Sequence, residues 1–380
     1  MIKSKYPNIG TSIFAVMSNM AKENNAINLS QGFPGFDCSK RLFELVNKYM
    51  KKGFNQYAPM EGVLALRERI SEKTSTLHNH TYNPEKEINV TAGATQALFT
   101  AITAFIGEGD EVIIFEPAYD SYVPAIEMNG GQPVFVKLKQ PDYHIPWDEV
   151  QRSITSKTKM IIINSPHNPT GTVLTEADIK NLQKIINSSG ILILSDEVYE
   201  HIIFDNIQHE SICRYPDLAE RSIIVSSLSK TFNATGWKIG YCMAPENMMK
   251  EFRKVHQFQI YTVNHPVQHA IAEFLKKEDN YLYLSSFYQE KRDFFENLIK
   301  ETKFKPLKSY GSYFQLVDYS YISDENDIIF AERLTKENKV ASIPVSVFHH
   351  DKLDEKKLRF CFAKENELLE KAVKKLRKIS

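Results

Sequence analysis

Cysteines are few in this 380-residue sequence, and they follow no pattern. No paired spacing occurs, so the sequence predicts neither a disulfide framework nor a zinc motif, and we expect no metal site. Long apolar runs are also absent: no stretch approaches the ~20 residues that cross a bilayer, and the N-terminus lacks the apolar core of a secretion signal. These absences favour a cytoplasmic protein with no membrane partner. The four cysteines are Cys38, Cys213, Cys242 and Cys361.

The sequence has no excess of either charge. It contains 47 lysine and arginine residues against 47 aspartate and glutamate residues, a formal net charge of zero. A balanced chain offers no positive surface for nucleic acid or an anionic membrane, so we expect no nucleic-acid partner and favour a small-molecule ligand. The length exceeds the size at which one core usually keeps growing, and 42% hydrophobic residues supply a large core.

What the sequence does have is a series of short apolar runs rich in β-branched residues. Each run is bounded by turn residues, and several are separated by segments with helical spacing, such as TQALFTAITAFIG and TEADIKNLQKIINSSG. This alternation predicts an α/β fold with a mostly parallel sheet that helices cover on both faces. The runs are EINVTAG, EVIIFEP, PVFVKL, KMIIINSP, ILILSDE and SIIVSS.

The character of the sequence changes from Pro266 onward, where long charged helical patterns take over. Two strand-like segments, SYFQLVD and KLRFCFAK, lie among them and predict a smaller α+β domain in the C-terminal third. We expect residues 48–280 to form the large domain and residues 281–380 the small one. The N-terminal segment, residues 1–47, is expected to pack with the small domain.

Two charged residues directly follow predicted strands. Lys230 lies in SSLSKTFNATGWKIGY, a turn that follows the run SIIVS, and Asp196 follows the run ILILS. Side chains at the carboxyl ends of parallel strands face the crevice in which open α/β folds bind ligands. A carboxylate there is costly unless it is paired with a cation or well hydrogen-bonded. Taken alone, Lys230 also fits a solvated turn lysine, so the remaining motifs decide between the two interpretations.

Three further motifs suit the binding of anions. In TAGATQAL a strand passes into a helix, so Ala94, Thr95 and Gln96 are candidates for a phosphate site, although small residues there also serve simple capping. Asn168 in NSPHNPTG offers a rigidly held amide or forms an ordinary turn. Arg359 lies on the otherwise apolar strand KLRFCFAK, where its guanidinium suits either a substrate carboxylate or an internal salt bridge.

An imine-forming amine, an anion cradle, a buried carboxylate and a carboxylate-binding arginine are together the parts of a pyridoxal phosphate enzyme. The order and separation of NSPHNPTG, SDEVYEH, SLSKTFNATGWKIGY and LRFCFAK resemble the class I and II aminotransferases of fold type I. The segments INLSQGFPGFD, NQYAPMEG, TAGATQAL and FEPAYDSY bring the resemblance closer to the branch with the bacterial methionine aminotransferases and the kynurenine and glutamine aminotransferases. The resemblance covers nearly the whole chain.

The resemblance implies a fold and an activity. The fold would be a large domain on a mostly parallel, seven-stranded sheet with a smaller α+β domain, and the cofactor would be pyridoxal 5'-phosphate. The activity would be ping-pong transfer of the amino group of a large uncharged amino acid to a 2-oxo acid. Methionine and aromatic amino acids lead the expected donors, and glutamine and kynurenine are included. The resemblance further implies a homodimer with shared active sites.

It also assigns roles around the cofactor. Lys230 matches the lysine that binds the cofactor covalently and carries a proton during catalysis. Asp196 matches the carboxylate that pairs with the pyridine nitrogen. Tyr119 matches the aromatic ring that stacks on the cofactor. Asn168 and Tyr199 match the groups that hydrogen-bond its phenolic oxygen, which makes Tyr199 the third catalytic residue. The implied phosphate ligands are Ala94, Thr95, Gln96, Ser227 and Lys238, with Tyr57 supplied by the neighbouring subunit.

For the substrate, the resemblance implies that Arg359 holds the carboxylate with help from Asn168 and the backbone of Gly32. An apolar pocket is expected around the substrate side chain. No second arginine stands out for an acidic substrate. The residues expected around the side chain are Phe33, Tyr119, Val263 and Phe348.

Three alternatives remain beside this interpretation. The first is a carbon–sulfur β-lyase for cysteine conjugates on the same scaffold. The second is the sensor half of a transcription regulator, which we disfavour because the aminotransferase-like region begins within the first thirty residues. The third is a doubly wound α/β protein whose motifs are coincidental. In every case we interpret His167 and His201 as turn and packing residues rather than catalysts.

Overall fold

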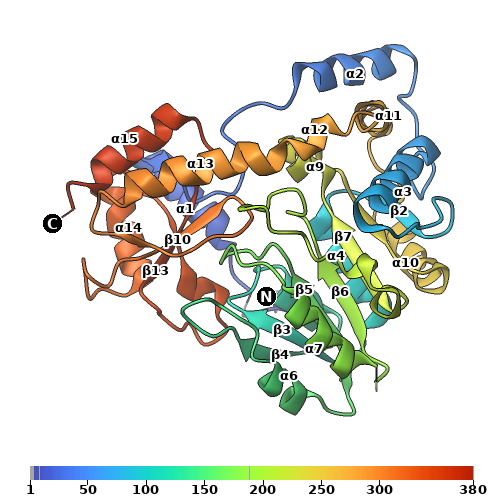
Figure 1. The fold of residues 1–380 in the computed structure, drawn as a ribbon, viewed down its shortest axis with the longest axis horizontal. Helices are drawn as coiled ribbons and strands as arrows, with labels where there is room; N and C mark the ends of the chain where they lie inside the picture. The colour runs from blue at the N-terminus through green and yellow to red at the C-terminus, as the bar shows by residue number, and fades with distance from the viewer. Residues whose placement is uncertain (1–3, 8, 188, 380) are drawn as a thin grey trace.

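The computed structural model describes residues 4–7, 9–187 and 189–379. A large sheet with helices on both faces occupies one side of the molecule, and a smaller sheet with its own helices occupies the other (Figure 1). Among the described residues no helix is both long and apolar enough to span a membrane.

The large sheet has seven strands in the order β2-β8-β7-β6-β5-β3-β4. Strand β8 pairs antiparallel with both of its neighbours, and the remaining pairs are parallel. The α/β fold class and the mostly parallel, seven-stranded sheet are therefore confirmed. The strands are β2 (Ile88–Thr91), β3 (Glu111–Glu116), β4 (Gln132–Lys137), β5 (Thr158–Asn164), β6 (Leu192–Asp196), β7 (Ser222–Ser226) and β8 (Gly240–Met243).

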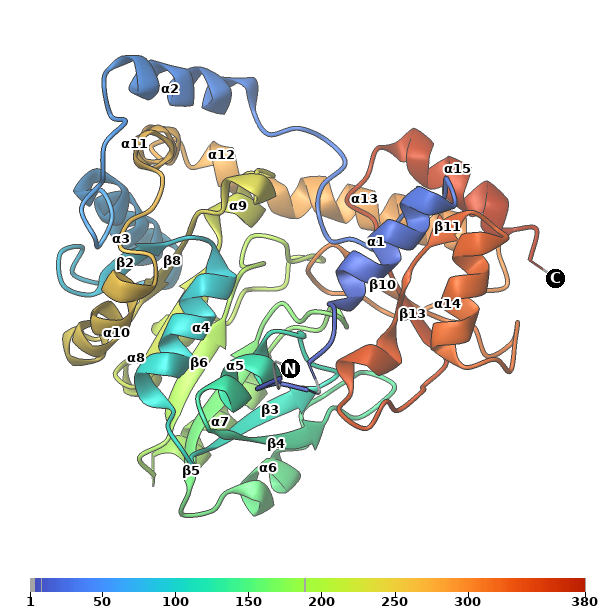
Figure 2. The same ribbon diagram turned by 180° about the vertical axis from the view of Figure 1, so that it is seen from behind.

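Apolar side chains of one strand divide between the two faces of the sheet because successive residues point in opposite directions. In β3, Val112 and Ile114 belong to the core on one face, and Ile113 and Phe115 to the core on the other. This arrangement explains why the strands are nearly continuous apolar runs. Figure 1 looks onto the face covered by α6 (Trp147–Ser153) and α7 (Glu176–Ile186). Figure 2 looks onto the face covered by α4 (Ala94–Phe105) and α5 (Tyr122–Met128).

Further helices complete the surroundings of the large sheet. Helix α2 packs against α11, and α10 packs against α4. Two short helices, α9 and the 3₁₀ turn η2, lie between β7 and β8. The bounds are α2 (Lys40–Lys51), α3 (Leu64–His78), η1 (Ile212–Arg214), α8 (Pro216–Ala219), α9 (Leu228–Thr231), η2 (Thr235–Trp237), α10 (Glu246–Gln259) and α11 (His265–Phe274).

The smaller sheet is antiparallel, with the order β12-β13-β10-β9. Strand β1 of the N-terminal region pairs in parallel with β11, and α1 lies against α14, so the first residues pack with the C-terminal third (Figure 2). The exact domain limits stay a prediction. The elements are α1 (Ile13–Glu23), β1 (Ile27–Asn28), α12 (Asp279–Leu282), α13 (Leu284–Ile299), β9 (Lys305–Pro306), β10 (Phe314–Asp318), α14 (Asp327–Lys336), β11 (Val340–Ala341), β12 (Ile343–Pro344), η3 (Val345–Phe348), β13 (Lys357–Cys361) and α15 (Asn366–Leu376).

Candidate active site

A cavity of about 300 Å³ lies where β5, β6 and β7 end, between the large sheet and the smaller one. This is the position at which open parallel sheets bind ligands. Side chains from the N-terminal segment, the large sheet and strand β13 meet there. Of the residues expected at the site, the lining includes Gly32, Phe33, Ala94, Thr95, Tyr119, Asn168, Asp196, Tyr199, Ser227, Lys230, Lys238 and Arg359.

Lys230 lies in the short helix α9, directly after β7. The hydroxyl of Ser227 caps this turn by accepting a hydrogen bond from the backbone N–H of Lys230 at 3.3 Å. The Lys230 ammonium donates to the hydroxyl of Tyr313 at 2.7 Å and to the carbonyl of Gly32 at 3.0 Å. Burial lowers the pKa of Lys230 to about 8, and the charges of Arg359 and Lys238 act in the same direction. About a tenth of this amine is therefore neutral and nucleophilic at about pH 7, far more than for an exposed lysine.

Asp196 is the last residue of β6 and is fully enclosed. One carboxylate oxygen accepts from the hydroxyl of Tyr122 at 2.7 Å, and the other from the backbone N–H of Val198 at 3.3 Å. Burial raises the pKa of Asp196 to about 6, although these hydrogen bonds oppose the shift. A cationic partner would restore the ionised form, so this carboxylate is suited to a protonated ring nitrogen.

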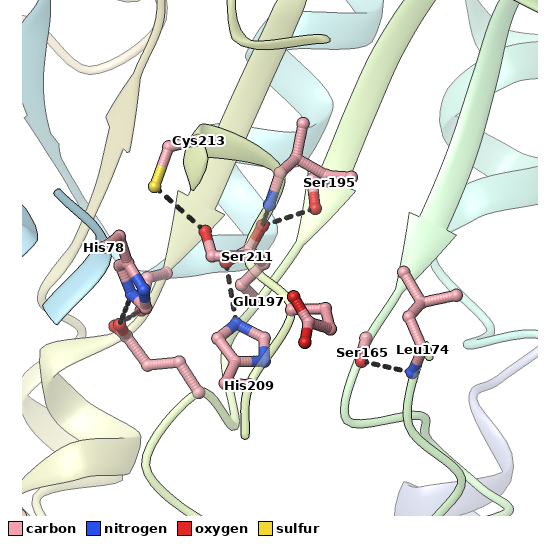
Figure 3. Close-up of polar contacts among 12 residues, drawn as sticks. His78, Ser165, Leu174, Ser195, Glu197, His209, Ser211 and Cys213 are labelled. Atoms are coloured by element: carbon pink, nitrogen blue, oxygen red, sulfur yellow. Dashed lines mark hydrogen bonds and ion pairs between the residues drawn. The ribbon is translucent and has the colours of Figure 1, made fainter. Parts of the chain in front are cut away.

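The residues on either side of Asp196 in the chain, Ser195 and Glu197, are held by polar contacts of their own (Figure 3). The next residue, Glu197, accepts hydrogen bonds from Ser195 Oγ at 2.7 Å and from the backbone N–H of Ile212 at 3.1 Å. Its other oxygen lies 2.8 Å from Nε2 of His209. Glu197 is itself buried. Because buried carboxylates with several partners are held in one geometry, this group fixes the direction in which β6 presents Asp196.

An anion cradle lies at the start of α4. Gly93 precedes the helix with φ +80°, and a Cβ added to it would lie 3.1 Å from the Lys238 ammonium. A Cβ on Gly240 would lie 2.7 Å from the backbone nitrogen of Ala94, so glycine is required for this close approach. The free N–H groups of the first helical turn, the Ser227 hydroxyl and the Lys238 ammonium are donors of the kind that hold a phosphate. The cradle therefore fits the phosphate of the expected cofactor.

Gln96 contributes to this cradle less than expected. Its side-chain oxygen accepts from the backbone N–H of Ala92 at 3.0 Å. Its amide nitrogen donates to Thr100 at 2.6 Å and to Gln259 at 3.0 Å. These bonds direct the side chain toward α10, and it does not line the cavity. Only the backbone of Gln96, in the first turn of α4, lies beside the anion position.

Arg359 lies at the other end of the cavity. Its guanidinium donates to Oδ1 of Asn168 at 2.6 Å and to the carbonyl of Ser30 at 3.1 Å, and it lies 3.9 Å from the ring centre of Phe314. Burial lowers the pKa of Arg359 to about 10, so it stays a cation. Among the described residues its hydrogen bonds go only to these two neutral groups, and its Nε has no hydrogen-bond partner. The nearest acidic influence is the charge of Asp120, which forms no ion pair with it. The sequence allowed an internal salt bridge as the alternative partner of Arg359, and the described residues form none. The site is therefore suited to an external carboxylate.

Besides Gln96, three expected residues do not line the cavity. Phe348 is buried behind it, with its ring centre 5.3 Å from Arg359 Cζ and 6.1 Å from the ring of Phe14, which takes the position at the wall. Val263 is buried in the main core. Tyr57 is 80% exposed, with its ring 5.8 Å from that of Tyr261.

The two histidines interpreted as packing residues are buried away from the cavity. Nδ1 of His167 lies 2.8 Å from the hydroxyl of Thr170. His201 lies beside the buried ion pair of Lys73 and Glu200. Burial lowers the pKa of each histidine to about 3, so neither is protonated at neutral pH.

Three residues that hold the site were missed by the sequence interpretation: Asn164 lines the cavity, while Tyr122 and Tyr313 bond Asp196 and Lys230. Tyr122 and Asn164 stand within motifs already singled out, FEPAYDSY and NSPHNPTG, and Tyr313 lies in the predicted strand SYFQLVD. Asn164 accepts the backbone N–H of Asn168 at 2.8 Å and donates to the carbonyl of Asp196 at 2.9 Å. The motifs therefore contained two of these residues, Tyr122 and Asn164, but gave no sign of the atoms that their side chains contact.

Comparison with known proteins gives the same family throughout. Residues 24–376 match the family Aminotransferase class I and II. The chain is 46% identical to the methionine aminotransferase of Escherichia coli over 378 residues, 99% of this chain and 98% of that protein. It is 34% identical to the kynurenine–oxoglutarate transaminase of Dictyostelium discoideum over 410 residues, 97% of this chain and 94% of that protein.

Solved structures agree with the sequence matches. A crystal structure of an E. coli methionine aminotransferase superposes with a TM-score of 0.96 at 45% identity, covering 100% of this chain and 99% of that chain. The N-succinyldiaminopimelate aminotransferase of Mycobacterium tuberculosis also gives a TM-score of 0.96, at 34% identity and complete coverage of both chains.

Tyr122→Phe tests the support of Asp196. A raised carboxyl pKa means that the stability contributed by Asp196 is present at low pH and is lost as the pH rises through about 6. At about pH 8 the ionised carboxylate loses a charge-assisted hydrogen bond, so we expect the unfolding free energy of the cofactor-free protein to fall by about 1.5–3 kcal/mol. At about pH 5 the loss should shrink to about 0.5–1.5 kcal/mol, because the carboxyl is mostly protonated.

Urea denaturation at the two pH values measures this difference. Tyr82→Phe is the matched control, because Tyr82 is also buried but its hydroxyl has no partner among the described residues. Its removal should not lower stability. An equal loss for Tyr122→Phe at both pH values would contradict a bond to a titrating carboxylate.

Proposed function

The chain belongs to the class I and II aminotransferases, and from this premise we propose that it transfers the amino group of a large uncharged amino acid to a 2-oxo acid. The family makes it a pyridoxal-phosphate-dependent enzyme. The observation that carries the proposal is the meeting, in one cavity, of the Lys230 amine and the Arg359 guanidinium, which among the described residues bonds only neutral groups. Methionine and aromatic amino acids are the proposed donors, with glutamine and kynurenine in the same range.

When bound, pyridoxal phosphate supplies an aldehyde carbon for the amino group and an electron-withdrawing ring. We propose that Lys230 binds it covalently and later holds and releases the proton of the substrate's Cα. Asp196 would pair with the ring nitrogen, and Tyr119 would lie against the ring. The Tyr199 hydroxyl, whose pKa burial raises, stays a hydrogen-bond donor for the phenolic oxygen, with Asn168 beside it. The proposed phosphate ligands are Ala94, Thr95, Ser227, Lys238 and the backbone of Gln96.

The substrate class follows from the charges that line the cavity. The lining contains three cations, and the proposal gives each a function: Lys230 for the amino group, Lys238 for the phosphate and Arg359 for the substrate carboxylate. A second substrate carboxylate finds no further cation among the described residues of the cavity wall. Phe14, whose ring lies 5.1 Å from Arg359 Cζ, and Phe33 both line the cavity and favour an apolar side chain instead. The similarity to a methionine aminotransferase supports the same choice.

The carbon–sulfur β-lyase alternative has no support in the comparisons. It shares the binding steps with transamination and differs in the group that leaves Cβ. No residue of the cavity described here favours elimination specifically. It is therefore an outcome of the activity test and not a second proposal.

We also propose a cytoplasmic homodimer with shared active sites. Tyr57 and Phe258 are 80% and 88% exposed, and Tyr261 beside Tyr57 is half exposed, so an aromatic surface is available for a second copy. Tyr57 would reach the phosphate of the neighbouring subunit from this surface. The four cysteines are free and buried, which suits a reducing compartment.

Lys230→Ala tests the covalent attachment. After borohydride reduction, the wild-type chain should gain the mass of the reduced cofactor at Lys230, whereas the variant should gain none. Transamination should fall by at least about 10²–10⁴-fold, because the proton carrier is lost. Lys238→Ala is the control: it should bind the cofactor more weakly but still retain it covalently. Cofactor fixed to the Lys230→Ala chain would refute the assignment.

Arg359→Ala tests the carboxylate site. We expect kcat/KM for methionine to fall at least about tenfold, the value of a lost charge-assisted hydrogen bond. Arg359→Lys keeps the charge but loses the planar fork, and should give an intermediate value.

Wild-type protein should lose the long-wavelength absorbance of its cofactor with methionine and phenylalanine, but not with aspartate. Pyruvate and ammonia released from cysteine conjugates without a 2-oxo acid would favour the lyase.

Mixed dimers test the shared site. Lys230→Ala and Tyr57→Ala chains should each be impaired alone, and subunit exchange between them should restore activity. Each mixed dimer would contain one site with Lys230 from one chain and Tyr57 from the other, and one site with both changes. If Tyr57 served the site of its own chain, mixing would restore nothing.

A further inference from the structure

A second group of chemically reactive side chains lies outside the cavity, where the loop after η3 meets the large sheet. The carbonyl of Phe348 accepts from the backbone N–H of Ala118 at 2.9 Å, which brings the next residues of this loop to the end of β3. There Glu116 is buried and His349 is 2% exposed. Asp351, on the same loop, is exposed. The group therefore joins the smaller domain to the large sheet.

Three of these side chains have the spacing of a metal site. One oxygen of Glu116, one ring nitrogen of His349 and one oxygen of Asp351 all lie within 4.8 Å of one another. The Glu116 carboxylate is already oriented by His350, which donates its backbone N–H at 2.5 Å and lies with Nδ1 2.8 Å from the second oxygen. His350 is in turn stacked on Phe135, at 3.9 Å between ring centres. An oriented carboxylate is the kind of support that metal ligands have.

The environment of His349 is a second reason, separate from the spacing, to expect a ligand here. Neither of its ring nitrogens has a hydrogen-bond partner among the described residues. Nδ1 lies 3.9 Å from the Glu116 carboxylate, which is too long for a hydrogen bond. A buried imidazole with both nitrogens unsatisfied is costly, and buried polar groups of this kind usually have a ligand or water. One of its ring nitrogens lies within 4.8 Å of an oxygen of each of the two carboxylates.

We propose that Glu116, His349 and Asp351 bind a divalent transition-metal ion, with zinc as the representative, that links the smaller domain to the end of β3. An imidazole nitrogen with two carboxylate oxygens suits zinc, whereas calcium and magnesium prefer oxygen ligands throughout. Three protein ligands leave a fourth position for water. The sequence expectation of no metal rested on cysteine spacing, and this group contains no cysteine.

Lys137 is the competitor for this site. Its ammonium lies 2.5 Å from the Asp351 carboxylate, and its side chain is 37% exposed. An exposed ion pair contributes little, so the ammonium is free to move into solvent when a metal binds Asp351. Because Lys137 competes with the metal for Asp351, removal of the Lys137 charge should tighten metal binding.

The test uses the untagged holoenzyme, freed of metal by dialysis against a chelator. Zinc is then titrated against a chromophoric chelator, with thermal unfolding as a second measurement. We expect one zinc ion per chain and a higher midpoint of unfolding with zinc. Asp351→Asn, at an exposed position, and His349→Gln should each weaken binding at least about tenfold.

Two further variants separate a built site from adventitious binding. Lys137→Met should bind zinc more tightly than wild type. His144→Gln removes an exposed histidine elsewhere and should bind as wild type does. The proposal is overturned if the wild-type chain binds no stoichiometric zinc, or if Asp351→Asn and His349→Gln both bind it unchanged. Because binding is measured directly, this result is independent of the transaminase activity.

Discussion

A buried guanidinium without an anionic partner is the constraint on which the site depends. Arg359 belongs to a strand of the smaller domain, yet its hydrogen bonds go to Asn168 of the large domain and to Ser30 of the N-terminal segment. Both acceptors are neutral, and a buried charge that lacks an opposite charge lowers stability. Three separate parts of the chain are thus folded around a cation that forms no ion pair within the described residues. A substrate carboxylate recovers this energy on binding, which favours substrate carboxylates over neutral molecules.

Burial also acts on two other charged groups of the cavity, Lys230 and Asp196, in opposite directions. Burial lowers the pKa of Lys230 to about 8 and raises the pKa of Asp196 to about 6, so each is displaced toward its neutral form. The two groups do not pair with each other: Lys230 is held by Tyr313 and Gly32, and Asp196 by Tyr122. A separation of this kind leaves the amine available for covalent chemistry and the carboxylate available for a ring cation. The cavity is therefore prepared for a ligand that carries both an aldehyde and a basic ring nitrogen.

The sequence was sufficient for the residues whose position depends on local structure. Lys230 and Asp196 follow apolar strands, and the ends of parallel strands meet at one edge of a sheet, so their proximity could be predicted. The position of Tyr313 could not be predicted, because this residue reaches Lys230 from the smaller domain and its place depends on how the two domains meet. Gln96 was expected to bind phosphate because it lies at a helix start, but its side chain hydrogen-bonds Thr100 and Gln259 instead.

The prediction of the sheet and of the aromatic residues was limited in the same way, because sequence patterns do not show how distant segments pack. The apolar runs predicted six of the seven strands but not β8, the strand that runs antiparallel to both of its neighbours. Phe14 and Phe348 are both apolar aromatics near Arg359, and only packing decides that Phe14 lines the cavity while Phe348 lies behind it. Phe348 nevertheless connects the two halves of the site: its ring contacts Arg359, and its carbonyl bonds Ala118, the residue before Tyr119. The distance between the proposed carboxylate site at Arg359 and the proposed ring position at Tyr119 is thus set through this residue. Because the orientation of a bound amino acid decides which of its bonds breaks, a buried residue that touches no ligand helps to determine the reaction.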